Sequence, residues 1–260
     1  MGSKGISIGI DVGSITVKAA AMEDGKLLAT QVASTGYNPS EAAKRIYERL
    51  LSGLGAKDSL VCGIVATGYG RRSVSFAQRV VTEITCHGKG ADFQYPGVRT
   101  VIDIGGQDSK AISLDGSGRV QDFAMNDKCA AGTGRFLEVM AKALEVELDL
   151  FGKVSLQAPS PSSISSLCTV FAESEVISLI AKGESRDNII AGIHEAIGTR
   201  IASMIERIAV QEPVLMTGGV AKNQGVLETL RKKLGVEIIV PKHPQENGAI
   251  GAAIVAAEMR

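Results

Sequence analysis

Short apolar runs that end in glycine-containing turns occur twice along the chain, in the same order. Residues 8–12 and residues 101–104 each form such a run, and a second apolar run follows each turn. The second run reaches Asp24-Gly25 in the first copy and Asp115-Gly116 in the second. Because Asp-Gly between alternating apolar runs is a strong hairpin signal, each copy predicts a two-stranded hairpin.

A third strand and a helical pattern follow the hairpin in each copy. The third strands are predicted at residues 27–32 and 119–124. Apolar residues recur at helical spacing in five ranges, 40–51, 134–144, 170–180, 224–233 and 247–258,. The 30 glycines, combined with many Val, Ile and Ala residues, favour an α/β protein with tight turns near its ligands,.

The two copies also match residue by residue. Four residues of the first copy recur in the second at an offset of 92 positions, Asp11 as Asp103, Gly13 as Gly105, Lys18 as Lys110 and Ala19 as Ala111. Two copies of one unit imply two similar domains that face each other. We expect the first domain to comprise residues 1–96 and 241–260, and the second to comprise residues 97–240. The return of the last helix to the first domain rests on fold analogy.

Charge and hydropathy argue against two classes of partner. The 28 basic residues balance the 28 acidic ones, whereas a general nucleic-acid binder usually has a net basic surface,. No apolar run reaches the roughly 20 residues that a membrane helix needs. The first residues carry no signal-peptide pattern. We therefore expect a cytoplasmic protein that binds neither nucleic acid nor membrane.

The glycine turn of each copy has the composition of a phosphate site. Backbone N–H groups in such a turn can form an anion-binding nest, and Lys18 adds a point charge. The carboxylates at the strand ends, Asp11 and Asp103, can hold Mg²⁺ through its waters. One of them, or Gln107, could orient an attacking water. A single turn of this kind is an ordinary β-turn at least as often, and its repetition in matching contexts favours the phosphate site.

A third glycine turn adds a candidate nucleotide contact. Gly218-Gly219 joins a short apolar strand at 214–217 to the helical pattern at 224–233. This arrangement can place backbone against an adenosine or its phosphates, although a tight strand-to-helix connection gives the same pattern. The chain contains no G-x₄-G-K-[ST] motif and no G-x-G-x-x-G after a strand, so P-loop and Rossmann sites are disfavoured.

Two of the four cysteines precede predicted helices. Cys129 stands before a glycine-rich turn, and Cys168 stands before Thr169, a good N-cap,. A helix N-terminus lowers a thiol pKa and stabilises a bound anion, such as a thiolate-ligated cluster. A [4Fe–4S] cluster takes four cysteines, and a twofold dimer would supply them from two per chain. A zinc ion is the chemical competitor because four cysteines also suit Zn²⁺.

The remaining cysteines and the histidines are interpreted as packing residues. Cys62 lies in the apolar run 60–66 and is expected in the core. Four residues are assigned no chemistry and are expected to pack or to cap, namely Cys86, His87, His194 and His243. The cysteine spacing does not match a disulfide scaffold, and a reducing cytoplasm disfavours disulfides.

Five segments of the chain resemble one known family. Residues 9–18, 103–108 and 218–223 resemble the two phosphate motifs and the adenosine motif of the acetate-kinase/sugar-kinase/Hsp70/actin superfamily. Residues 126–136 and 168–176 narrow the resemblance to the BadF/BadG/BcrA/BcrD-type ATPases. These include the activators (archerases) of 2-hydroxyacyl-CoA dehydratases and the ATP-binding subunits of benzoyl-CoA reductases. The resemblance covers almost the whole chain.

The resemblance implies an α/β fold of two duplicated actin-like (ribonuclease H-like) ATPase domains with a nucleotide cleft between them. It implies catalytic roles for Asp11, Asp103 and Gln107. It also implies one [4Fe–4S] cluster per homodimer, held by Cys129 and Cys168. The residues that would bind ATP or ADP with Mg²⁺ are Gly13, Ser14, Ile15, Thr16, Lys18, Gly105, Gly106, Gly218, Gly219, Val220, Asn223 and Gln245.

The implied function is ATP hydrolysis coupled to one-electron transfer. Domain movement would shift the helices that begin near Cys129 and Cys168. An electron from ferredoxin or flavodoxin would then pass through the homodimer to an iron–sulfur dehydratase or reductase. A sugar-type kinase would share the glycine motifs but gives no reason for the two cysteines. A non-catalytic nucleotide switch would bind ATP without releasing phosphate.

Overall fold

The computed structural model describes residues 5–165 and 169–259. The chain folds into two compact units. Unit 1 comprises Met1–Val101, Leu114–Gln121 and Pro241–Arg260, and unit 2 comprises Ile102–Ser113 and Asp122–Val240. Cys168, one of the two cysteines expected to hold a cluster, lies outside the described residues. No helix in the described part of the chain is both long and apolar enough to cross a membrane.

Unit 1 is built on a five-stranded sheet in the order β3-β2-β1-β4-β5. Its strands are β1 (Ile6–Val12), β2 (Thr16–Glu23), β3 (Lys26–Ser34), β4 (Val61–Thr67) and β5 (Arg79–Val80). Every residue of β1 is buried. This strand pairs antiparallel with β2 and parallel with β4, so it forms the centre of the sheet.

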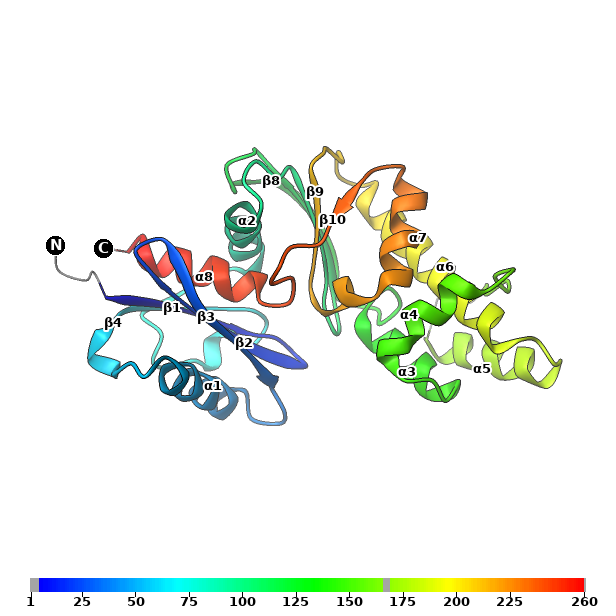
Figure 1. Cartoon of the computed structure of the whole chain (residues 1–260), viewed down its shortest axis with the longest axis horizontal. Helices are drawn as coiled ribbons and strands as arrows, with labels where there is room; N and C mark the ends of the chain where they lie inside the picture. Colours follow the sequence, from blue (N-terminus) through cyan, green and yellow to red (C-terminus); the bar gives the residue numbers. More distant parts are fainter. Residues whose placement is uncertain (1–4, 166–168, 260) are drawn as a thin grey trace. The chain divides into compact units, whose positions relative to one another are not determined.

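Helices cover both faces of this sheet (Figure 1). They are α1 (Pro39–Leu54), α2 (Glu83–Gln94) and α8 (Asn247–Ala257). Alternate residues of β2 divide between the two faces, because Ala19 and Ala21 pack in the cluster that includes α1 while Ala20 packs with α8,. Asn38 caps the first turn of α1, and Gly55 ends that helix in the left-handed conformation,.

Small residues allow α8 to lie directly on the strands. A Cβ atom added at Gly9 of β1 would overlap the carbonyl oxygen of Ala249, and one at Gly251 would overlap the carbonyl oxygen of Cys86. Helix α8 is therefore in backbone contact with β1 on one side and with α2 on the other. This explains why α8 is apolar on all sides instead of amphipathic,.

Unit 2 contains a second five-stranded sheet in the order β10-β9-β6-β7-β8. Its strands are β6 (Thr100–Ile104), β7 (Ser109–Leu114), β8 (Val120–Asn126), β9 (Val214–Thr217) and β10 (Ile238–Ile239). Strands β6, β7 and β9 are buried along their whole length, whereas the edge strand β8 is mostly exposed. The buried strands form the floor of the unit's hydrophobic core.

Helices α3 to α7 pack together in the described part of unit 2 (Figure 1). They are α3 (Gly134–Ala143), α4 (Leu148–Gln157), α5 (Thr169–Ala181), α6 (Arg186–Ile205) and α7 (Gln224–Leu234). Helix α6 is buried over much of its surface and contacts α4, α5 and α7. The fully buried Phe136, Met140 and Phe151 bring α3 and α4 into the same core.

The strand and helix predictions from the repeated pattern are confirmed. Each copy forms three successive strands, and the first hairpin turns at Asp24 and Gly25, both with positive φ. Helices occur in all five ranges with helical spacing, including α5 after Cys168. Helices α2, α4 and α6 were not predicted. Helix α6 has apolar residues on several sides, so its sequence shows no single apolar face,.

The placement of Cys62 in the core was wrong. Cys62 is exposed, as the second residue of β4, and its thiol donates to the carbonyl oxygen of Ile6 at 3.0 Å. Burial of β4 begins only at Gly63, where the strand passes under α8. An apolar run thus identified the strand without locating where its burial starts.

The contact between Gly9 and α8 predicts the cost of an added methyl group. Gly9→Ala should lower the free energy of unfolding by about 3 kcal/mol, because the helix backbone must move away from the strand,. Gly53→Ala in α1 is the matched control, since its Cβ would meet only the Gln31 side chain at 3.9 Å. That change should leave stability unchanged or raise it by up to about 1 kcal/mol. Urea denaturation measures both, and equal stabilities for the two variants would contradict the packing described.

Candidate nucleotide and cluster sites

The first phosphate turn is built around a carboxylate and a lysine on paired strands. Asp11 of β1 lies opposite Lys18 of β2 in the antiparallel register. The Lys18 Nζ atom is 3.2 Å from the Asp11 Oδ2 atom, and their side chains are only 14% and 8% exposed. A carboxylate this deeply buried needs a cationic partner, which the hairpin register supplies.

The backbone of this turn is held tightly. The Gly13 N–H donates to the Thr16 carbonyl oxygen at 3.1 Å, and the Thr35 hydroxyl donates to the Gly13 carbonyl oxygen at 2.7 Å. A Cβ atom at Gly13 would lie 2.8 Å from the Thr16 oxygen and 3.1 Å from Lys18 Nζ. Glycine is therefore required next to the Asp11–Lys18 pair, and Ser14 is left exposed at the tip of the turn.

The second copy reproduces the same pair in unit 2. Lys110 of β7 approaches Asp103 Oδ2 at 3.4 Å, and it also contacts Asp108 Oδ2 at 2.7 Å. The Asp103 and Lys110 side chains are each 4% exposed. Gln107 is exposed at the tip of this turn, between Gly106 and Asp108. The residues that repeat in the sequence therefore form an equivalent buried charge pair in each unit.

A Thr-Gly pair at the end of a strand is a further element that both units share, and it was not predicted from the sequence. Thr67 ends β4 beside Asp11 in the parallel register, and Gly68 follows it. In unit 2, Thr217 ends β9 and donates its hydroxyl to Asp103 Oδ1 at 2.7 Å. The only sequence signal is the shared Thr-Gly pair after an apolar strand, which is too short to recognise without the structure.

The glycine after each of these threonines lies against the carboxylate strand. Gly68 and Gly218 have nearly the same positive φ, 87° and 85°. A Cβ atom at Gly68 would overlap Asp11 Oδ1, and one at Gly218 would overlap the carbonyl oxygen of Ile104. Positive φ and backbone contact both favour glycine at these positions.

The third glycine turn is anchored at its far end. Asn223 caps α7, because its Oδ1 atom accepts the N–H of Val226 at 3.1 Å. The same oxygen lies 3.2 Å from His194 Nε2, and His194 Nδ1–H donates to the carbonyl oxygen of Ile190 at 2.8 Å. Burial lowers the pKa of His194, which favours its neutral form,. His194 is therefore a buried packing residue, as predicted.

The predicted nucleotide residues are divided between the two units. Gly13, Ser14, Ile15, Thr16, Lys18 and Gln245 belong to unit 1, whereas Gly105, Gly106, Gly218, Gly219, Val220 and Asn223 belong to unit 2. In unit 2 the second phosphate turn and the third glycine turn meet, since a Cβ at Gly134 would lie within 3.4 Å of both Gly106 and Val220. Gln245 is half-buried in the segment that leads into α8.

The Cys129 loop is stabilised by hydrogen bonds of its own. The Asn126 side chain donates to the carbonyl oxygens of Cys129 at 2.8 Å and Ala131 at 3.2 Å. Cys129 is half-buried and packs against the core of unit 2. It stands five positions before the first residue of α3, so a full turn of backbone separates the thiol from that helix. The field of the helix dipole falls off within about one turn, which weakens its expected effect at Cys129.

The two helices that follow the candidate ligands contact each other. Helix α5 starts at Thr169, immediately after the segment outside the described residues, and it packs on α3. Within the described residues, no group of three or more His, Cys, Asp or Glu side chains is arranged to hold a metal ion.

The thiol of Cys86 is buried and unreactive. Cys86 is fully buried in α2, and burial raises the pKa of its thiol to about 12, with a hydrogen bond to Thr67 acting in the opposite direction. At neutral pH this thiol is protonated and is a poor nucleophile. The side-chain amide nitrogen of Asn247 in α8 donates to Nδ1 of the neighbouring His87 at 3.2 Å. Both residues join α2 to α8, in agreement with the packing role assigned to them.

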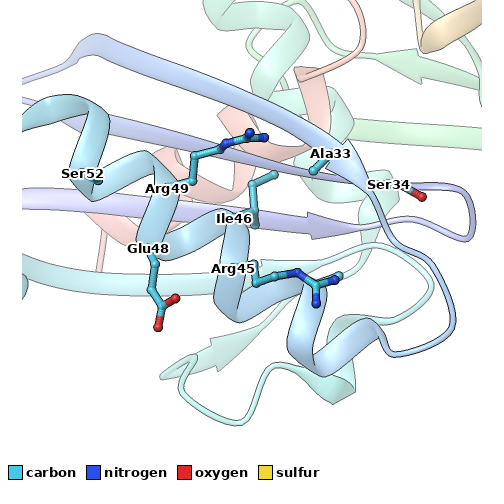
Figure 2. A pocket seen from close by; sticks show the side chains of 8 residues that line it. Ala33, Ser34, Arg45, Ile46, Glu48, Arg49 and Ser52 are labelled. Atoms are coloured by element: carbon cyan, nitrogen blue, oxygen red, sulfur yellow. The ribbon is translucent and has the colours of Figure 1, made fainter.

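A groove of about 560 Å³ runs along α1 in unit 1. Figure 2 shows Arg45 and Arg49 of α1 on one side and Ala33 and Ser34 of β3 on the other. Its lining contains none of the predicted nucleotide residues. The groove nevertheless reaches the neighbourhood of the phosphate turn, because its lining residue Ser34 pairs with Thr16 in the sheet.

The fold belongs to the class of actin-like ATPases and sugar kinases, as the sequence predicted. A glucokinase of the ROK family from Streptomyces griseus matches 98% of this chain and 100% of its own with a TM-score of 0.59 at 13% identity. At that identity the likeness concerns the fold alone.

Comparison with protein families narrows this fold class to one family. The model of the BadF/BadG/BcrA/BcrD ATPase family matches residues 8–256, and the chain belongs to this family. An activator of lactoyl-CoA dehydratase from Anaerotignum propionicum is 48% identical over 97% of this chain and 97% of its own. The resemblance stated from the five sequence segments is thereby confirmed.

Two solved structures of relatives have the same fold throughout. Component A of the (R)-2-hydroxyglutaryl-CoA dehydratase from Acidaminococcus fermentans has a TM-score of 0.94 at 43% identity, over 98% of this chain and 99% of its own. The activator of the 2-hydroxyisocaproyl-CoA dehydratase from Clostridium difficile, with bound ADPNP, has a TM-score of 0.92 at 43% identity, over 98% and 95%. The second of these holds an ATP analogue, which agrees with membership of an ATPase family.

Proposed function

We propose that the chain is an ATP-dependent one-electron donor that activates a 2-hydroxyacyl-CoA dehydratase or a related iron–sulfur reductase. Family membership and the names of the relatives support this function. The structural observation that carries it is a direct hydrogen-bonded connection between the second phosphate turn and the helix that follows the Cys129 loop. A sugar-type kinase of the same fold gives no reason for the two cysteines.

The nucleotide part of the proposal rests on the two buried charge pairs. Asp11 or Asp103 would hold Mg²⁺ through its waters, and one of them or the exposed Gln107 would orient the attacking water. Lys18 and the glycine turns receive the phosphates. The adenosine would lie against Gly218, Gly219 and Val220. Asn223 and Gln245 are the other two proposed nucleotide contacts. The ADPNP-bound relative supports ATP and ADP as the nucleotides.

The cluster part of the proposal rests on the donor atoms of this chain. A [4Fe–4S] cluster takes four cysteine thiolates, and each chain has two cysteines in the matching family segments, Cys129 and Cys168,. A homodimer with the cluster on its twofold axis supplies all four. The Cys129 thiol fits this role because it is half-buried on a loop of small residues. When bound, the cluster would supply a single low-potential electron.

The connection between the two sites consists of backbone hydrogen bonds within unit 2. The N–H of Gly134 donates to the Gly105 carbonyl oxygen at 2.9 Å, and the N–H of Arg135 donates to the Gly106 carbonyl oxygen at 2.8 Å. A helix start leaves such N–H groups without helical partners, and here the phosphate turn satisfies two of them. A shift of the turn on nucleotide binding or hydrolysis therefore moves the start of α3 and the Cys129 loop attached to it.

The energies involved are sufficient for this coupling. Shifting a two-state equilibrium from about 1:99 to 99:1 requires roughly 5.5 kcal/mol of differential binding. For a single electron this corresponds to on the order of 230 mV. Ferredoxin or flavodoxin is the proposed electron donor, and the difficult reaction on the acyl-CoA belongs to the partner enzyme.

Removal of one thiol tests the cluster assignment. Cys129→Ser should abolish the EPR signal of the reduced protein and reduce bound iron to background, while ATP affinity in calorimetry stays within a few-fold of wild type. Cys62→Ser is the matched control because Cys62 is exposed in unit 1, and it should retain both iron and signal. Full iron content in Cys129→Ser would remove this residue from the ligand set.

A larger side chain at the contact between the second phosphate turn and α3 tests whether the nucleotide site and the cluster site are coupled. Gly134→Ala places a methyl group 3.2 Å from the Gly105 oxygen and 3.4 Å from Val220, so the turn and the helix must separate by a few tenths of an ångström. In the wild-type protein, ATP should increase the rate at which a chelator removes iron from the cluster. We expect Gly134→Ala to keep its cluster and to lose most of this increase. Gly53→Ala should behave as wild type. A full nucleotide response in Gly134→Ala would show that the two sites communicate by another route.

A further inference from the structure

We propose that Thr217 is a positioning residue for ATP hydrolysis that fixes the orientation of the Asp103 carboxylate. This inference rests on the proposed function, because it takes Asp103 as part of the hydrolytic site. Thr217 lies outside the residues singled out in the sequence, at the end of β9 and directly before the third glycine turn.

The two oxygens of Asp103 are held from two different strands. Thr217 of β9 donates to Oδ1 at 2.7 Å, and Lys110 of β7 approaches Oδ2 at 3.4 Å. Thr217 is completely buried and Asp103 is 3% exposed, so water cannot replace the hydroxyl. A carboxylate held at both oxygens cannot rotate about its Cβ–Cγ bond, and its geometry is therefore set before any nucleotide binds.

The backbone next to Thr217 makes this contact rigid. Gly218 has a φ of 85° and packs against the carbonyl group of Ile104, the residue after Asp103. The hydroxyl contact and the backbone contact lie side by side between β9 and β6. Thr217 therefore ties the strand that ends in the third glycine turn to the carboxylate of the second phosphate turn.

The same residue type recurs at the equivalent position in unit 1. Thr67 ends β4 opposite Asp11 in the register, it is completely buried, and Gly68 follows it in contact with Asp11. Valine would suit a buried strand equally well. The Thr67 hydroxyl makes no hydrogen bond to Asp11, however, and its polar neighbour is the Cys86 thiol, so unit 1 repeats the position of the threonine while the hydroxyl-to-carboxylate contact is specific to Thr217.

Isosteric substitution separates the hydroxyl from the packing. In Thr217→Val, phosphate release should show kcat lowered on the order of 10- to 100-fold, because a misplaced catalytic group costs factors of this size. The KM for ATP should change less than about threefold, since the valine keeps the shape of the glycine turn. Thr217→Ser restores the hydroxyl and should recover kcat to within a few-fold. Thr199→Val removes an exposed hydroxyl from α6 of the same unit and should leave kcat unchanged.

A double-mutant cycle distinguishes positioning from general damage to the fold. If Thr217 acts through Asp103, adding Thr217→Val to Asp103→Asn should cause little further loss of kcat. A kcat of wild-type size in Thr217→Val, or equal losses in both backgrounds, would overturn the inference. Failure of the wild-type protein to release phosphate would instead count against the proposed function, so the two failures are distinguishable.

Discussion

A buried carboxylate paired with a lysine on the next strand is the interaction on which both units of this protein depend. Asp11 with Lys18, and Asp103 with Lys110, lie where little water reaches them. An unpaired charge at such a depth would cost several kcal/mol, so each hairpin must keep the register that brings its lysine opposite its carboxylate. That register in turn sets the glycine turn between the two strands. The candidate phosphate sites therefore follow from charge pairing inside the sheets.

The two copies of this arrangement have different surroundings. In unit 2 the carboxylate strand leads into a turn whose carbonyl groups accept the first N–H groups of α3. The Cys129 loop ends at that helix, and α5 packs on it. In unit 1, α8 lies in backbone contact with β1. In the part of the chain that the structure describes, unit 2 links its phosphate turn to the loop of a candidate cluster ligand.

The sequence predicted the features that repeat or have a clear period. The offset of 92 positions placed Asp103 and Lys110 correctly, and helical spacing located α1, α3, α5, α7 and α8. Contacts between distant segments had no such signal. The hydrogen bond from Thr217 to Asp103 joins residues 114 positions apart, and Thr-Gly pairs are too common to suggest it. The apolar residues around α6 and the exposed thiol of Cys62 show that composition alone does not determine which side of an element is buried.

Titration of anaerobically purified wild-type protein with ADP and with a non-hydrolysable ATP analogue, followed by EPR and by iron and protein analysis, tests whether nucleotide state reaches the cluster. We expect one [4Fe–4S] cluster for every two chains and a cluster spectrum that differs between the two nucleotides. A full cluster in each single chain, or a spectrum indifferent to the nucleotide, would contradict it.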